Sequence, residues 1–186
     1  MFNREERRER REERQQDRSF GRRKSGNTIY KMRERMVSIG DDFFIEDQDD
    51  NRVFKVNGKA LRVRETLIFE DLQNHELCKI QGQMLRVKET MEIESPVGKR
   101  VAMVKKALIA PLRDRWVVKI GNGPDLDVQG NILDHEYTIE AGRNKIAEVS
   151  KRWFRLTDVY GVEVEPGQND VLILAATVAI DMMAHD

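Results

Sequence analysis

The chain has 186 residues, of which 39% are hydrophobic and 35% are charged, and its formal net charge is zero. This length and apolar content suit one domain with a buried core, and the balanced charge argues against general nucleic-acid binding. The single cysteine, Cys78, cannot form an internal disulfide, which favours a cytoplasmic protein over a secreted one.

The first 27 residues form a charged segment with ten Lys or Arg residues against six Asp or Glu residues. The segment lacks the apolar stretch of a signal peptide and has too few apolar residues to form a core. We therefore predict a solvated, partly helical tail at 1–27 and one folded domain at 28–186. The alternative for the tail is an arm that binds anionic lipid, RNA or a partner protein.

Two consecutive segments of the folded domain, 43–66 and 67–90, align without a gap. Nine of their aligned pairs are identical, among them Gly58 and Gly82, and most of the other pairs keep their apolar or polar character. In each segment, aromatic and β-branched residues flank a polar stretch rich in turn-forming side chains. The repeat therefore predicts two successive β-hairpins, and a third unit begins at Met91 before it diverges.

The same pattern of short apolar stretches separated by glycine, proline and asparagine predicts strands through the rest of the domain. Helical periodicity does not recur there. The further predicted strands cover 28–32, 101–105, 113–120, 126–129, 137–140, 145–149 and 159–163.

The last predicted element is a helix over 170–185, whose interior is apolar except for Thr177 and Asp181. A helix that is apolar on every side must be enclosed. This one is too short to cross a bilayer, which requires about 20 apolar residues, so the protein's own sheet must enclose it. Asn169 or Asp170 is expected to cap its first turn.

Residues 28 to 166 provide room for roughly a dozen strands at about one strand per 8 to 12 residues. An eight-stranded barrel is filled by its own side chains, whereas a barrel of about 11 strands accommodates a central helix. We therefore predict an all-β fold with one helix, in which a closed antiparallel barrel of about twelve strands surrounds the buried C-terminal helix.

Three stretches of the sequence carry a family resemblance. They are FKVNGKALRVRETLIFED with its second copy, AEVSKRWFRLTDVYGVEV, and GQNDVLILAATVAIDMM. Together they resemble the LURP-one-related family of the tubby C-terminal-like superfamily, which also includes the phospholipid scramblases. The resemblance covers about 28–183 and implies a twelve-stranded barrel around a hydrophobic C-terminal helix. Because tubby domains bind phosphoinositides and scramblases move lipids, it also implies a lipid or membrane-surface partner.

One segment begins like a calcium-binding loop. Asp47, Asp49 and Asn51 match the opening D-x-D-x-N, but Arg52 and Gly58 occupy the positions of the required glycine and glutamate. The segment is therefore predicted to be a hairpin turn.

Other candidate chemistry is sparse. His75, His135 and His185 show no metal-ligand spacing with one another or with Cys78, so we predict no metal site and no cofactor. The serines lie in no catalytic signature, and we predict that the protein is not an enzyme. Asp181 is expected to meet a buried arginine or backbone donors near the barrel mouth, because an unpaired buried carboxylate is costly.

Basic residues are concentrated between 99 and 119, where Asp114 is the one acid. Alternation along 113–120 places the basic side chains on the face opposite Trp116 and Val118. Such a face could hold the phosphates of anionic lipids; its alternative is an ordinary solvated strand surface. The candidate lipid-binding residues are Lys99, Arg100, Lys105, Lys106, Arg113, Arg115 and Lys119.

The sequence thus favours a non-enzymatic binding module that binds anionic phospholipid headgroups, which implies peripheral association of a cytoplasmic protein with a membrane. A protein-interaction scaffold without lipid or catalytic activity is the main alternative, and an enzyme with unrecognised loops is a more distant one. No specific nucleic-acid partner is expected.

Overall fold

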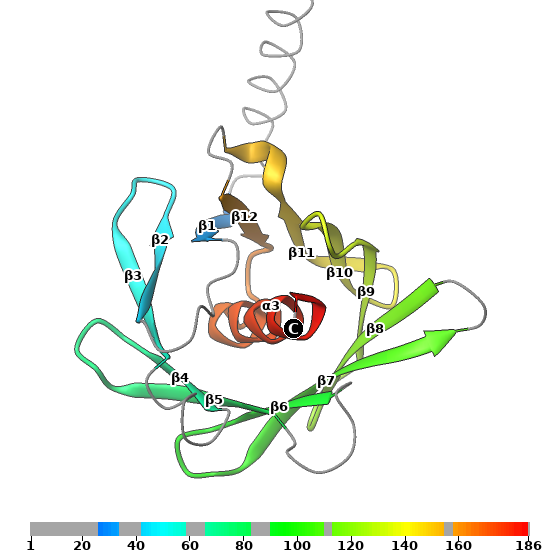
Figure 1. Cartoon of the computed structure of the whole chain (residues 1–186), viewed down its shortest axis with the longest axis horizontal. Helices are drawn as coiled ribbons and strands as arrows, with labels where there is room; N and C mark the ends of the chain where they lie inside the picture. Colours follow the sequence, from blue (N-terminus) through cyan, green and yellow to red (C-terminus); the bar gives the residue numbers. More distant parts are fainter. Residues whose placement is uncertain are drawn as a thin grey trace, which may run out of the picture.

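The computed structural model of the chain describes residues 26–33, 42–58, 66–82, 90–109, 113–154 and 158–185, without the side chains of 107–109 and 113–114. Twelve strands form a closed barrel in which each strand pairs with its neighbours in sequence, and β1 closes the barrel between β2 and β12. All strand pairs are antiparallel, including the closing pair of β1 and β12. The C-terminal helix α3 lies inside the ring of strands (Figure 1). This architecture confirms the predicted fold.

The first six strands are β1 (Thr28–Arg33), β2 (Phe43–Asp47), β3 (Arg52–Asn57), β4 (Thr66–Glu70), β5 (Glu76–Gly82) and β6 (Thr90–Glu94). The others are β7 (Arg100–Ile109), β8 (Arg113–Ile120), β9 (Leu126–Asn131), β10 (Glu136–Ala141), β11 (Asn144–Ser150) and β12 (Val159–Val164). The short 3₁₀ helix η1 (Lys151–Trp153) follows β11, and α3 spans Asp170–His185.

The sequence repeat produces three hairpin turns of the same design, between β2 and β3, β4 and β5, and β6 and β7. Each is closed by a backbone hydrogen bond between residues four positions apart: Asp47 N–H to the Asn51 carbonyl (2.8 Å), Asp71 to His75 (3.0 Å) and Ser95 to Lys99 (2.8 Å). The residue before the last has a positive φ in each turn: Asp50 (64°), Asn74 (64°) and Gly98 (77°). The third unit therefore keeps the turn geometry beyond the point where sequence identity fades.

The Asp47 carboxylate is part of the first turn. Its Oδ1 accepts hydrogen bonds from the backbone N–H groups of Asp49 (2.8 Å) and Asn51 (3.0 Å). Hydrogen bonds from the Asn51 side chain and backbone lower the pKa of Asp47. Asp71 accepts the equivalent bonds from Gln73 and His75 in the second turn. The segment that opens like a calcium loop is thus the hairpin turn predicted from the sequence.

Helix α3 fills the barrel interior. All of its residues from Ile173 to Asp181 are buried, and the apolar ones pack in one core with inward-facing strand residues such as Phe69 and Ile80. The Asn169 side chain accepts a hydrogen bond from the Leu172 N–H (3.1 Å), which identifies Asn169 as the cap. In the described residues, no helix combines the length and apolar character needed to cross a membrane.

Cys78 lies in β5 with 4% of its surface exposed. Burial, with a smaller contribution from the charge of Glu76, raises the pKa of its thiol to about 12. The reactive thiolate is therefore scarce at neutral pH. We expect iodoacetamide to leave the native protein unlabelled at pH 7.5 and to label it fully in denaturant, as measured by intact mass. Rapid labelling of the native protein would show that β5 opens readily.

Candidate functional site

The pairing of β7 with β8 fixes the faces of the candidate lipid-binding residues. Lys119 lies opposite Met103, and Lys105 lies opposite Val117. Trp116 is 3% exposed and Val118 is fully buried, so the alternating positions point outward. The structure thus places Arg115 and Lys119 on the solvent face, because the apolar side of β8 packs toward the interior.

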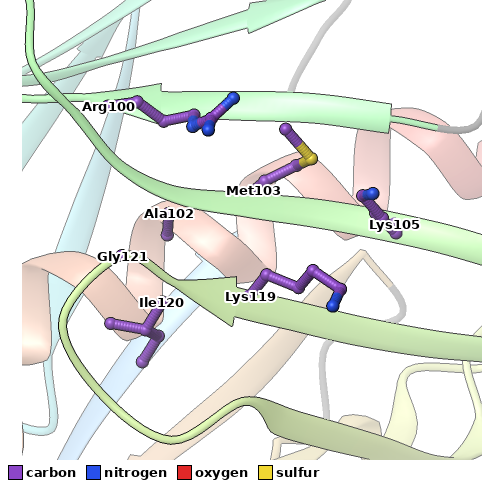
Figure 2. A pocket seen from close by; sticks show the side chains of 7 residues that line it. All are labelled: Arg100, Ala102, Met103, Lys105, Lys119, Ile120 and Gly121. Atoms are coloured by element: carbon purple, nitrogen blue, oxygen red, sulfur yellow. The ribbon is translucent and has the colours of Figure 1, made fainter.

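A groove lies at one end of this strand pair, with a volume of about 200 Å³. Three basic side chains line it, from the start and middle of β7 and from β8. Figure 2 shows them with the Met103 and Ile120 side chains from the same strands. The lining residues, which we call the basic groove, are Arg100, Ala102, Met103, Lys105, Lys119, Ile120 and Gly121.

Acidic neighbours balance part of this charge. Arg100 pairs with Glu92 at 2.9 Å and Lys119 with Asp125 at 3.3 Å, and both basic side chains are more than half exposed. The Lys119–Asp125 pair is exposed on both sides and contributes roughly 0–1 kcal/mol, so an incoming phosphate can replace that carboxylate at little cost. The Glu92 side chain is only 16% exposed, so the exchange at Arg100 leaves a partly buried carboxylate without its partner and costs more. Lys105 forms no ion pair with any residue that the structure describes. Within the described residues, Lys105 is therefore the basic side chain of the groove that no carboxylate balances.

Three of the other candidate residues, Lys99, Lys106 and Arg115, do not line the basic groove. Lys99 is exposed in the β6–β7 turn. Lys106 lies opposite the inward-facing Trp116, with its Nζ 5.5 Å from the ring centroid. Arg115 forms an ion pair with Asp127 at 2.7 Å. The side chain of Arg113 is outside the described part of the chain. The structure therefore brings three of the seven candidates together.

The turn that precedes Arg100 carries an exposed apolar side chain. Val97 is 88% exposed, and it follows Pro96 within the turn closed by Ser95 and Lys99. Lys99 and Arg100 are the next charged residues along the chain. Val97 was not among the residues predicted from the sequence, although its position in a turn beside basic residues is visible there.

A second cluster lies where the end of α3 meets the β9–β10 turn. The His135 Nε2 and Asp181 Oδ1 atoms are 2.6 Å apart, and both side chains are 4% exposed. His185 Nδ1 lies 3.0 Å from the Asp181 carbonyl oxygen and 3.3 Å from Asp181 Oδ1. The expectation that a buried arginine or backbone donors meet the Asp181 carboxylate is wrong, because two imidazoles occupy that place.

Aromatic rings enclose the His135 imidazole in this cluster. It stacks on Tyr160 with centroids 4.2 Å apart and on His185 with centroids 5.2 Å apart. Burial, followed by the charge of Asp181, raises the pKa of the neighbouring Tyr137. One ligand-type atom from each of His135, Asp181 and His185 lies within 4.8 Å of the others, so these three side chains could hold a metal ion. Sequence spacing did not predict this convergence.

Comparison with known proteins agrees with the fold. An X-ray structure of an Arabidopsis thaliana protein superposes with a TM-score of 0.63 at 16% sequence identity, and the match covers 84% of this chain and 91% of the other. No curated protein matches the chain. The family model described as LURP-one-related matches residues 28–181. That match spans all twelve strands and most of α3, and the chain therefore belongs to the LURP-one-related family.

Proposed function

We propose that this LURP-one-related domain is a non-catalytic module that binds the phosphate groups of anionic phospholipids at a membrane surface. The observation that carries the proposal is the basic groove, where Arg100, Lys105 and Lys119 converge beside the apolar Met103 and Ile120. Lysine and arginine are common phosphate ligands. A groove that combines positive charge with these two apolar side chains suits a lipid headgroup at the surface of a bilayer.

The exposed turn beside the groove supports the same proposal. Val97 is 88% exposed, and entry of its side chain into the acyl boundary would contribute about 1.5–3 kcal/mol if burial were complete. Each basic residue near an anionic surface contributes roughly 1 kcal/mol to the binding free energy. This figure does not subtract the cost of breaking the existing ion pairs of Arg100 and Lys119. These contributions add up to roughly 4.5–6 kcal/mol, which corresponds to a dissociation constant between tens of micromolar and about 0.5 mM, so one domain should bind membranes weakly and reversibly.

Charge reversal in the basic groove tests the proposal. We expect the double variant Lys105→Glu/Lys119→Glu to bind phosphatidylserine-containing vesicles at least about tenfold more weakly than the unaltered protein, because two attractive charges become repulsive. Vesicle co-sedimentation measures the effect. Added salt should weaken the unaltered protein as well, since exposed charges are screened over about 8 Å at physiological ionic strength.

The matched control is the double variant Lys79→Glu/Arg143→Glu, which makes the same change in net charge outside the groove. It should retain most of the binding, whereas equal losses in the two variants would indicate a general charge effect. Val97→Asp should also weaken binding without a change in melting temperature. If the unaltered protein shows no preference for anionic over phosphatidylcholine vesicles, the lipid proposal fails and the protein-scaffold alternative takes its place.

A further inference from the structure

We propose that His135, Asp181 and His185 bind one divalent transition-metal ion of the zinc type, which ties the end of α3 to the β9–β10 turn. One ligand-type atom from each side chain lies within 4.8 Å of the other two. Two imidazoles and a carboxylate form a common donor set for such ions. This inference concerns a different part of the barrel from the basic groove and does not depend on lipid binding.

Two of the ligands come from one face of α3. Asp181 and His185 are four residues apart, and side chains with this spacing lie next to each other on a helix. Helical metal motifs use the same spacing for their paired ligands. The Asp181 side chain is buried, whereas 25% of the His185 side chain is exposed at the end of the helix. The pair therefore combines a fixed carboxylate with an imidazole that is accessible from solvent.

The third ligand comes from the turn between β9 and β10. His135 has a positive φ of 52°, a conformation in which histidine is enriched relative to most residues other than glycine. Stacking on Tyr160 fixes the ring beside Asp181. Packing that orients a ligand ring in this way is typical of metal sites, where the surroundings of the ligands set their geometry.

One of the distances between ligand atoms already matches a tetrahedral site, and a second is shorter. Zn–N and Zn–O bonds of about 2.0–2.2 Å place ligand atoms about 3.3 Å apart. His185 Nδ1 and Asp181 Oδ1 already have a separation of 3.3 Å. His135 Nε2 and Asp181 Oδ1, at 2.6 Å, are at hydrogen-bond distance and would move apart by about 0.7 Å.

One ring must turn for the lone pairs to converge. The imidazole planes of His135 and His185 are nearly parallel, with an interplanar angle of 7°, whereas two ligands of one ion direct their lone pairs at a common point. His185 is the side chain that can rotate, because it is the more exposed and lies in the last residue of α3. Solvent reaches the cluster from the same side, so water can complete the coordination.

The donor set also selects the kind of metal. Calcium prefers six to eight oxygen ligands, and this cluster has one carboxylate among two nitrogens. Imidazole suits zinc, nickel, copper and iron. Zn²⁺ and its spectroscopic substitute Co²⁺ are therefore the probes to use.

The experiment titrates the full chain, without a histidine tag, with Zn²⁺ by isothermal calorimetry and with Co²⁺ by visible absorption. We expect saturable binding of one ion per chain and a higher melting temperature with Zn²⁺, since ligands that bind the native state stabilise it. His185→Gln should weaken binding at least about tenfold. Nuclear magnetic resonance of the imidazole rings should show Zn²⁺-dependent shifts for His135 and His185.

His75→Gln is the matched control, since His75 is the histidine of the chain outside the cluster and its side chain is 76% exposed in a turn. It should bind metal like the unaltered protein. His135→Gln tests the buried ligand. If the His135→Gln protein fails to fold, His185→Gln still tests the proposal. Absence of saturable binding, or unchanged binding by His185→Gln, would overturn the proposal and leave the cluster as a hydrogen-bonded link.

Discussion

Replacement of Leu174 by aspartate is expected to unfold the domain. Leu174 lies in the second turn of α3 and is completely buried. Removal of a buried leucine side chain alone costs about 2–5 kcal/mol. An unpaired carboxylate in an apolar interior adds a desolvation cost of several kcal/mol more. Because a domain of ordinary stability has only about 5–15 kcal/mol in total, the change removes most or all of it.

Near-ultraviolet circular dichroism and a thermal melt measure this result. The matched control is Leu133→Asp, the same replacement at a side chain that is 64% exposed in the β9–β10 turn. It should change stability by no more than about 0.5 kcal/mol. A Leu174→Asp protein that melts cooperatively near the temperature of the unaltered protein would show that α3 does not fill the barrel.

The second large effect is expected from Gly130→Ala at the end of β9. Gly130 has a φ of +132°, which L side chains rarely adopt, and an added Cβ would lie 2.4 Å from the Glu136 carbonyl oxygen and 2.7 Å from Tyr137 Cα. Both are backbone atoms of β10, and Gly130 pairs directly with Tyr137. A side-chain rotation cannot relieve such a clash, so we expect destabilisation of at least about 3 kcal/mol.

Gly142→Ala separates the conformational strain from the clash. Gly142 also has a positive φ, +61°, but nothing lies within 4 Å of a Cβ built there. Its replacement should cost about 1 kcal/mol. At about 2–4 °C per kcal/mol for a domain of this size, thermal melts distinguish the two variants. Equal shifts for both would show that the backbone of β10 yields easily to the added atom.

Local sequence patterns predicted the barrel and its helix. The 24-residue repeat places a turn-forming side chain at Asp47 and again at Asp71, and the structure has the same turn at both. Alternation in β8 assigned Trp116 to the interior because a strand turns successive side chains to opposite faces. The apolar character of α3 on every side required an enclosure. These signals lie within single elements, and for that reason the sequence by itself determined the fold class.

The ion pairs formed by the basic residues of β7 and β8 could not be predicted from the sequence, because they depend on how neighbouring strands pair. Asp127 lies opposite Val117, and its carboxylate reaches Arg115 from the neighbouring strand β9. Nothing local in β8 marks Asp127 as that partner, because the register between two strands depends on the whole sheet. The sequence therefore predicted an accumulation of positive charge, and only the tertiary structure decided which charges are balanced and which line the groove.

The histidine cluster required closure of the barrel around the helix. Asp181 and His185 are neighbours on α3 by helical spacing alone, but His135 is 46 residues before Asp181. His135 lies beside Asp181 because the β9–β10 turn is located where α3 ends. A contact between residues so distant in sequence leaves no periodic signal in the chain. The sequence by itself determined the apolar helix, the repeated hairpins and the inward face of β8. Only the tertiary structure decided which polar side chains contact one another, since those contacts depend on strand register and on the position of the helix within the barrel.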